Sequence, residues 1–467
     1  MSKFRRYLEL SRKFYLYRTC SVAHSESLVN WFYQEVFRAS TYSNRPNTDT
    51  VKSNFIPLIL DLYICHKSYK KLKIAVSRSS NTYSTSRYQS SGVGYRPLDK
   101  MIDALESLRY IKVWRGYYDH NVRFGRVTRI RPKSRLIELI ESFGIKPKDI
   151  KHSSFNETIL LKDSDKHAID YQDTEETRLW RCELAEINKF LSQCYLSLYI
   201  SNEEYSRLAT KMQDRSVDKV RELDLSRIRL RRIYNNSSFD FGGRLYHGWW
   251  QEIPSDFRPF IRINHTETVE VDYKAIQLRM IYAIRELNTP RDPYLIEGIP
   301  DEKRGVLKKI INIIINADSE HKARTRIELD YPEENTDLLI RATIEKHSQI
   351  SDLFYSGEGS RLQRADSDLA VRIILRMMRE FHTPVLPVHD SFIVRNRFRD
   401  ELIQVMEEEF RSVYNRTGDT EIESDIRQDR WDQGEGRIYY GETNSDEVMD
   451  ELNTYSTYYT LESEWGP

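Results

Sequence analysis

Residues 269–279 read Val-Glu-Val-Asp-Tyr-Lys-Ala-Ile-Gln-Leu-Arg, and residues 386–394 read Leu-Pro-Val-His-Asp-Ser-Phe-Ile-Val. Each stretch places an aspartate, Asp272 or Asp390, at the end of a short apolar run typical of a buried strand. Two such carboxylates from different strands of one sheet can hold two divalent cations about 4 Å apart, which serves in-line phosphoryl transfer. A buried strand that ends in aspartate is common, so the pair needs support from the sequence between.

That support comes from residues 304–316, which carry polar side chains at every fourth position. Arg304, Lys308, Asn312 and Asn316 share one face of a predicted helix, and isoleucines can pack on the other side. Two cations followed by two amides suit a triphosphate with a sugar and a base beyond it. An amphipathic surface helix has the same pattern, and the position of this helix between the two aspartates favours the nucleotide.

In this order the segments resemble motifs A, B and C of the family A polymerases, the group of bacterial DNA polymerase I and the phage and mitochondrial single-subunit RNA polymerases. Motif A of that family is Asp-Tyr-Ser-x-Ile-Glu-Leu-Arg, similar to the stretch from Asp272. Motif B places Arg and Lys four apart, as residues 304 and 308 are, and motif C is His-Asp before a strand, as at His389. Weaker matches are Arg244, Arg258 and Gln363, so the resemblance runs from about residue 232 to residue 410.

The resemblance implies an α+β fold, a right-hand polymerase with an antiparallel palm sheet, reduced helical fingers and a helical thumb. It also implies two Mg²⁺ ions, replaceable by Mn²⁺, held by Asp272, Asp390 and the backbone carbonyl of Tyr273. Lys308 is then the proton donor to pyrophosphate. The implied nucleotide-binding residues are Arg304, Lys308, Gln277, Tyr273, Asn312 and Asn316, and the implied primer- and template-binding residues are Arg244, Arg258, Gln363 and His389.

The sequence departs from the DNA polymerases where the sugar is sensed. Gln277 stands where those enzymes have a glutamate that excludes a 2′-hydroxyl, and Asn312 and Asn316 replace an aromatic residue and a tyrosine of motif B. An amide can donate to a ribose hydroxyl as well as accept from it. Ser391 after His-Asp is also similar to the phage RNA polymerases. We therefore expect appreciable use of rNTPs beside dNTPs, and the sugar preference stays open.

The net charge of +1 over 467 residues hides a strong polarity. Residues 1–150 hold 28 Lys/Arg against 12 Asp/Glu, an excess that suits nucleic-acid phosphates. Within them, residues 92–135 show the helix, strand, basic turn and strand of a winged helix. The predicted DNA-binding residues near its wing are Arg115, Arg123, Arg126 and Arg129. A winged helix used only for packing or protein contact stays open, because its helix carries three acidic residues.

The chain is expected to comprise a basic, mostly helical, winged-helix-like domain at 1–150, a helical connector or thumb at 151–230, palm and fingers at 231–440, and a flexible acidic tail at 441–467. The tail either imitates nucleic acid, recruits a replication or regulatory protein, or is simply solvated. Four cysteines without close pairing fit a reducing cytoplasm. We expect no membrane span and no signal peptide.

The sequence thus predicts a template-directed nucleotidyltransferase, a small DNA polymerase that acts on a DNA template and primer. Residues 1–230 show no clear Asp-x-Glu proofreading motif, so no exonuclease is expected. Two alternatives stay open: a primase or single-subunit RNA polymerase that uses rNTPs, and a non-catalytic DNA-binding regulator on a palm scaffold. Replication, priming, repair, and a phage or mobile-element setting are equally compatible with the sequence.

Overall fold

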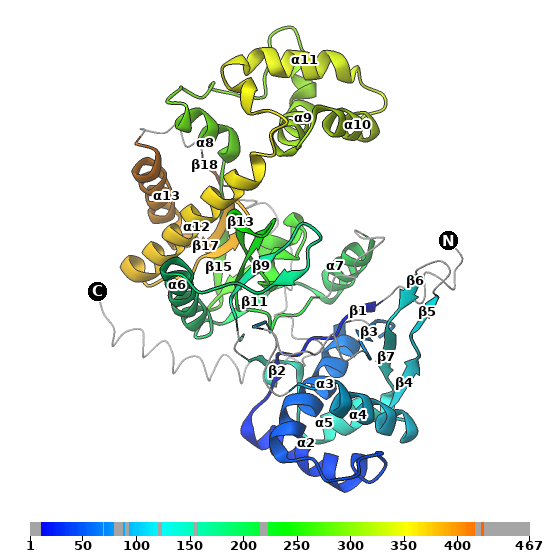
Figure 1. The fold of residues 1–467 in the computed structure, drawn as a ribbon. Coiled ribbons are helices and arrows are strands. Elements are labelled where there is room, and N and C mark those ends of the chain that lie inside the picture. Colours follow the sequence, from blue (N-terminus) through cyan, green and yellow to red (C-terminus); the bar gives the residue numbers. More distant parts are fainter. Residues whose placement is uncertain are drawn as a thin grey trace.

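The computed structural model describes residues 11–68, 70–78, 87–88, 93–119, 124–153, 155, 157–214, 223–415 and 422–424. Helices and mostly antiparallel sheets are mixed along the chain, so the fold class is α+β. Buried apolar side chains form two hydrophobic cores, one from Leu28 to Ile150 and one from Ile159 to Phe410. We call the parts built on them the front unit (residues 11–153) and the main unit (residues 157–424). Figure 1 shows the front unit below the main unit.

The front unit packs its helices against one face of a four-stranded sheet. Across the sheet the strands are β1 (Ser11–Lys13), β3 (Lys73–Val76), β7 (Thr128–Pro132) and β4 (Ile111–Trp114). The helices are α2 (Val22–Trp31), the π-helix η1 (Phe32–Val36), α3 (Thr48–Ser68), α4 (Tyr95–Ser107), α5 (Ser134–Ser142) and the short η3 (Pro147–Asp149). Strand β5 (Tyr117–Asp119) pairs with β6 (Phe124–Arg126), and β2 (Arg18–Thr19) pairs with β8 (Lys151–His152). Thus a helix, a strand, a hairpin and a returning strand occupy residues 95–132.

The main unit contains two sheets. The first has the order β10 (Ala168–Ile169), β9 (Ile159–Lys162), β12 (Arg231–Asn235) and β13 (Ser238–Tyr246). The second has the order β11 (Leu196–Leu198), β14 (Ile261–Ile263), β15 (Thr266–Tyr273), β17 (Ser391–Arg395) and β16 (Leu386–Val388), with β18 (Ile422–Ser424) also on β15. All strand pairs of the second sheet are antiparallel. Residues 151–230, expected to form a helical connector or thumb, carry the helices α6 (Glu175–Leu191) and α7 (Asn202–Asp214) and also contribute strands to both sheets. Their apolar side chains belong to the main core.

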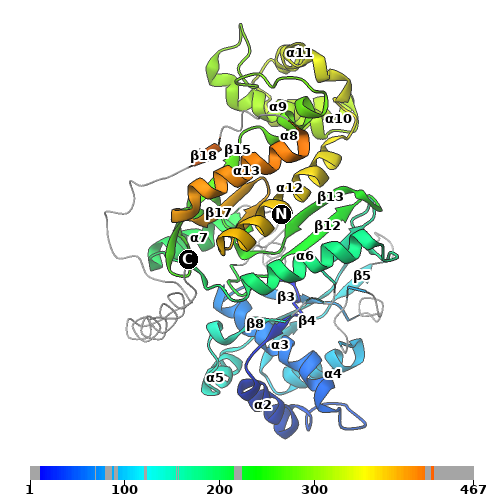
Figure 2. The ribbon, with the colours of Figure 1, turned by 90° about the vertical axis from the view of Figure 1, so that its left-hand side faces the viewer.

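The main unit also contains eight α-helices among its described residues. They are α6 (Glu175–Leu191), α7 (Asn202–Asp214), α8 (Ile276–Ile284), α9 (Arg304–Asn316), α10 (Glu320–Asp330), α11 (Thr336–Lys346), α12 (Gly359–Phe381) and α13 (Arg399–Tyr414). Short 3₁₀ helices connect them: η4 (Trp249–Gln251), η5 (Ser255–Phe260), η6 (Asp301–Lys303), η7 (Ser348–Leu353) and η8 (Asn396–Phe398). Helix α12 packs against β13, α13, α6 and α8, and Figure 2 shows α12 and α13 side by side. Helices α9, α10 and α11 gather at the end away from the front unit (Figure 1).

A buried ion network joins the two units. Asp61 of α3 accepts hydrogen bonds from Arg12 at 2.7 and 2.8 Å, from Arg18 at 2.7 Å and from the backbone N–H of Tyr15 at 2.9 Å. Arg18 also donates to Asp224 of the main unit at 2.7 Å. Each of these two carboxylates therefore has a cationic partner in the fold. No described helix is both long and apolar enough to cross a membrane, and the predicted acidic tail lies outside the described residues.

Candidate active site

The sheet register brings the two predicted aspartates to one edge of the second sheet. Strand β15 pairs with β17 so that Asp272 lies opposite Ser391. Strands β16 and β17 pair Val388 with Ser391, so His389 and Asp390 form the two-residue turn between them. His389 takes φ 60°, the left-handed conformation that such tight turns require. Asp390 therefore directly precedes β17, the strand that carries the neighbour of Asp272.

The carboxylate of Asp272 lies in an unfavourable environment. Burial and the negative charges of Asp390 and Glu270 together raise its pKa to about 7, although Lys308 opposes them. Its Oδ1 atom is buried and has no hydrogen-bond partner. Buried carboxylates that face like charges favour the protonated form unless a cation stabilises the charge. The fold thus leaves this edge of the sheet in need of positive charge.

Glu270 is a third acidic residue of this edge, and the sequence analysis missed it. It lies two residues before Asp272 on the same strand, so both side chains are on one face of the sheet. Its carboxylate accepts from Ser391 Oγ at 2.5 Å and from Arg258 Nε at 2.7 Å. Arg258, predicted to contact primer or template, is therefore held by Glu270. The period-2 spacing of residues 270 and 272 was the available signal.

A buried carboxylate on α12 also acts on this site. Asp366 is buried, and burial together with the charge of Asp390 raises its pKa to about 7, although Arg244 opposes the rise. Arg244, predicted to hold the primer, donates from Nη2 to Asp366 at 3.0 Å. Gln363, predicted to read the minor groove, is half-buried on the same helix, three residues before Asp366. Residues three apart on a helix share a face, so the sequence could have indicated that Asp366 lies near Gln363. No motif had assigned Asp366 to the site.

Helix α9 carries its polar stripe as predicted from the spacing, and two loop residues join it. Arg304 donates to Asp292 at 2.8 Å, and its guanidinium lies 5.2 Å from the ring centroid of Tyr294. The amino group of Lys308 lies 5.9 Å from the same ring and is exposed. Since Lys308 lowers the pKa of Asp272, the helix faces the acidic edge of the sheet. Asp292 and Tyr294 belong to a loop that no local pattern had singled out.

The structure brings together the amides predicted to face the sugar. Asn316 Nδ2 donates to Gln277 Oε1 at 3.3 Å and to the backbone carbonyl of Asn312 at 2.8 Å. Asn316 also lies tightly against Gly359, because a Cβ atom at Gly359 would be 2.9 Å from the Cα atom of Asn316. Asn312 is exposed beside this pair. Helices α8, α9 and α12 thus meet at these residues.

The ring of Tyr273 does not face the candidate nucleotide site. It is buried on the other side of the sheet, where its hydroxyl donates to the backbone carbonyl of Met406 at 2.6 Å. The prediction of nucleotide binding by this side chain is therefore wrong, because alternation along β15 turns residues 272 and 273 to opposite faces. The predicted metal contact through its backbone carbonyl stays a prediction. His389 is exposed at the turn, with its ring edge-on to Tyr246.

Two of the four predicted wing arginines have described side chains. Arg115 donates to Asp103 at 2.8 Å and to Glu106 at 2.6 Å, so a phosphate would compete there with acidic residues of α4. DNA binding by Arg115 stays a prediction. Arg129 donates to Ser11 Oγ at 2.6 Å. Arg123 lies outside the described residues, and only the backbone of Arg126 is described.

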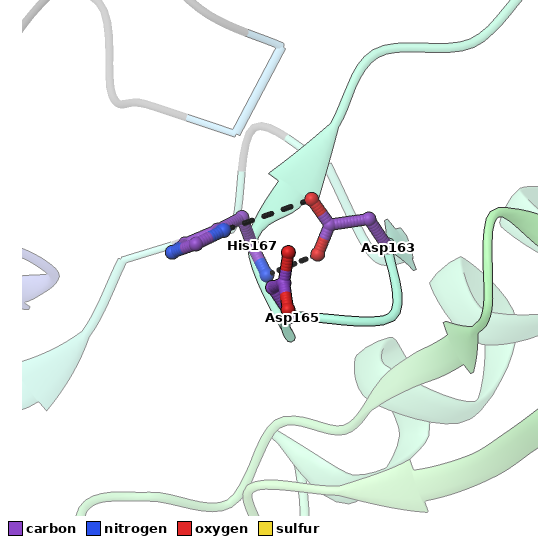
Figure 3. Close-up of side chains that lie close together, drawn as sticks. All are labelled: Asp163, Asp165 and His167. Atoms are coloured by element: carbon purple, nitrogen blue, oxygen red, sulfur yellow. Dashed lines mark hydrogen bonds and ion pairs between the residues drawn. The ribbon is translucent and has the colours of Figure 1, made fainter.

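A separate acidic group lies in the turn between β9 and β10. Figure 3 shows Asp163, Asp165 and His167, whose candidate ligand atoms lie within 4.8 Å of one another. Asp163 accepts from the backbone N–H of His167 at 2.8 Å, so part of this arrangement serves the turn itself. Among the described residues this is the group with three candidate ligands in reach of one ion. Exposed acidic groups of this kind are common without an ion, and it is not part of the Asp272 site.

Comparisons with known proteins identify no family for this chain. No protein-family model matches the sequence, and no curated protein matches it. Among solved structures, the POL domain of Pol1 from M. smegmatis, in complex with DNA primer-template and dNTP, matches over 90% of this chain and 68% of that chain, with 10% sequence identity and a TM-score of 0.27. A likeness at this TM-score carries no argument about function, which therefore has to be argued from the residues of the site.

Proposed function

We propose that this chain is a template-directed nucleotidyltransferase, a small DNA polymerase without an exonuclease that uses two-metal phosphoryl transfer. The observation that supports this most is the edge formed by Asp272, Asp390 and Glu270 opposite the basic stripe of α9. Acidic residues suited to divalent cations and cations suited to a triphosphate face one another there. Phosphoryl transfer needs this combination, because its catalysis is mostly positioning and charge neutralisation.

The residues of the acidic edge fit divalent cations. Asp272 Oδ1 has no hydrogen-bond partner among the described residues, and burial together with the charges of Asp390 and Glu270 outweighs the opposing effects of Lys308 and a backbone hydrogen bond. Hard cations such as Mg²⁺ prefer carboxylate oxygens. Asp272 and Asp390 would hold them, and two bound ions would supply neutralisation of the attacking and leaving oxygens. Glu270 is already bound by Ser391 and Arg258, so its role is to position these groups.

Lys308 and Arg304 have different roles towards a triphosphate. Arg304 is held by Asp292, which fixes its direction but requires phosphate to compete with a carboxylate. For Lys308 the described residues provide contact with the ring of Tyr294 and no ion pair. A lysine ammonium with three free donors can both bind phosphate and give up a proton. Lys308 is therefore the proton donor to the leaving pyrophosphate in this proposal.

The contact between Gln277 and Asn316 favours a second candidate function, synthesis of RNA by a primase or RNA polymerase. Two amides in contact provide both donors and acceptors, whereas a carboxylate and a ring would reject a ribose hydroxyl. The third candidate, a regulator on an inactive palm, is disfavoured. Without a cation, the repulsion around Asp272 costs stability and brings nothing in return.

Primer extension tests the proposal directly. The full chain is given a primed DNA template, Mg²⁺ and labelled dNTPs or rNTPs in parallel. We expect template-directed incorporation that EDTA abolishes, and the ratio of the two nucleotides decides between the first two candidates. If neither nucleotide is incorporated, with or without a primer, the first two candidates are excluded and the non-catalytic regulator is the remaining candidate function.

Helix α9 offers a matched pair of variants for the same assay. Lys308→Ala should lower kcat by about 10²- to 10⁴-fold, the usual contribution of a general acid. Lys309→Ala removes the neighbouring lysine, which lies instead 5.7 Å from the ring of Tyr331, and should leave kcat unchanged. Equal effects of the two substitutions would show that only the charge of the helix matters.

A further inference from the structure

The sheet of the front unit has one apolar face and one cationic face. Alternate residues of its strands, such as Ile74 and Ile130, belong to the buried core. The register places the intervening residues of neighbouring strands side by side: Lys13 beside Ala75, Ala75 beside Arg129, Arg129 beside Trp114, and Arg131 beside Lys112. We call the outward residues of these strands the cationic sheet face; its accessible charged and aromatic members are Lys13, Lys112, Trp114, Arg129 and Arg131, and Lys73 is fully buried among them.

Positive charge accumulates on this face. No Asp or Glu occupies a described position of the four strands β1, β3, β4 and β7. The amino groups of Lys73 and Lys112 each lie 5.1 Å from the ring centroid of Trp114, and the guanidinium of Arg131 lies at 5.7 Å. Three cations thus converge on one indole. Burial and the repulsion from Arg131, Arg129 and Lys112 together lower the pKa of Lys73 to about 8.

Two arginines beside helix α4 are paired with its acidic residues. Arg115 is bound by Asp103 and Glu106, and Arg78 forms ion pairs with Asp99 and Asp103. The helix expected to approach DNA therefore presents carboxylates that repel phosphate. The strands β1, β3, β4 and β7 carry cations without a carboxylate at any described position, on the other side of the core.

We infer that the cationic sheet face binds single-stranded nucleic acid, with phosphates against its lysines and arginines and a base against Trp114. Its width argues for a single strand. Neighbouring strands lie about 4.8 Å apart, so four strands span about 14 Å, which exceeds the major-groove width of about 12 Å in B-DNA. An open sheet with an aromatic residue among cations is a platform on which the splayed bases of a single strand can lie.

This binding goes beyond the proposed function, because it requires neither metal nor chemistry at Asp272. Lys112 is exposed and can move from the indole to a phosphate, and the partly exposed ring of Trp114 lies beside it. Arg131 and Arg129 are half-buried and fixed by the strand pairing. The surface therefore combines a mobile cation, fixed cations and one ring, and it would hold a template strand without reading its sequence.

Fluorescence anisotropy of the full chain tests the inference in EDTA, without nucleotide. The probes are a labelled oligothymidylate and a labelled duplex of the same length, at several salt concentrations. We expect tighter binding of the oligothymidylate. Lys112→Glu should weaken it about tenfold and reduce the slope of log affinity against log salt by about 0.7, the value per phosphate contact in a single strand.

Lys52→Glu is the matched control, since Lys52 is an exposed lysine of α3 in the same unit; its affinity should equal that of the wild type. Trp114→Leu should weaken binding with an unchanged salt slope. Because Trp114 is half-buried, thermal melting must show that Trp114→Leu is folded. If this variant is unfolded, the result for Lys112→Glu decides the outcome, because Lys112 is exposed. Equal affinities of Lys112→Glu and wild type, or tighter binding of the duplex, would overturn the inference.

Discussion

Buried carboxylates occur at the junction of the two units and at the candidate active site, and the fold treats them in opposite ways. At the junction, burial raises the pKa of Asp224, but Arg18, Arg227 and Ser226 together lower it by more, so that it lies below its ordinary value. At the site, burial, Asp390 and Glu270 together raise the pKa of Asp272 to about 7, and one of its oxygen atoms has no hydrogen bond. The buried carboxylate of the first region is paired with cations of the chain, whereas that of the second is not.

This difference separates a structural region from a functional one. Burying a charge costs several kcal/mol unless it is paired and hydrogen-bonded, so a fold keeps unpaired charges only where they serve another purpose. The arginines around Asp61 and Asp224 meet that requirement inside the protein. Asp272 would meet it only with a cation from solution. The predictions below test this contrast.

Removal of a carboxylate at the site should have the largest effect. Asp272→Asn or Asp390→Asn should lower nucleotide incorporation by about 10³-fold or more, because metal-based charge stabilisation is worth several kcal/mol in the transition state. The same substitutions should leave the unfolding free energy unchanged or raise it, since they remove a repelling charge. Primer extension and denaturant unfolding measure the two effects. Lost stability in either variant would contradict the contrast between the two regions.

Removal of a carboxylate at the junction should act on stability instead. Asp61→Asn leaves Arg12 and Arg18 without their common partner, and should lower the unfolding free energy by about 3–5 kcal/mol. Denaturant unfolding measures this loss. Asp400→Asn is the control, because its exposed ion pair with Arg399 should contribute at most about 1 kcal/mol. If Asp61→Asn proves as stable as the control, the junction network is not structural.

The junction should also weaken in acid. Burial lowers the pKa of His152 to about 3, and its ring stacks on that of Tyr17 at 5.5 Å. The unfolded chain binds a proton near pH 6.5 and the folded chain does not, so stability is full above that pH and falls as pH decreases towards 3. The loss between pH 7.5 and pH 5 should be about 2 kcal/mol.

Urea unfolding at the two pH values measures this dependence. His152→Gln carries no titratable group and should show less of the loss, which isolates His152 from other titrating residues. Burial also lowers the pKa of the neighbouring His247, so part of the pH-dependent loss of stability should remain in the variant. An identical pH dependence of variant and wild type would show that His152 is not the titrating group.

The smallest expected effect concerns the choice of sugar. Gln277→Glu places a negative charge beside Asn316 and should shift the dNTP/rNTP ratio of kcat/KM towards dNTPs by about tenfold. Asn316→Tyr should act in the same direction, but it must fit against Gly359, so Gln277→Glu is the cleaner test. Competition assays with both nucleotides measure the ratio. A steep wild-type preference for dNTPs that Gln277→Glu does not alter would place selection elsewhere.

The sequence by itself determined the local elements of the site. Alternation and apolar runs predicted the strands that end at Asp272 and Asp390, which are β15 and the β16–β17 hairpin. Spacing by four predicted the stripe of α9 from Arg304 to Asn316. These patterns are readable because the direction of a side chain follows from the period of its own strand or helix. The same rule applied to Tyr273 would have shown that its ring faces away from Asp272.

Only the tertiary structure decided which charged groups meet. Arg258 is held by Glu270, Arg244 by Asp366, and Arg115 by acidic residues of α4, although sequence had predicted all three arginines as nucleic-acid ligands. The strands within residues 151–230 likewise became apparent from their pairing with distant segments. An arginine carries the same local pattern whether its partner is a phosphate or a carboxylate. The choice depends on distances between elements far apart in the chain, which packing and strand register set.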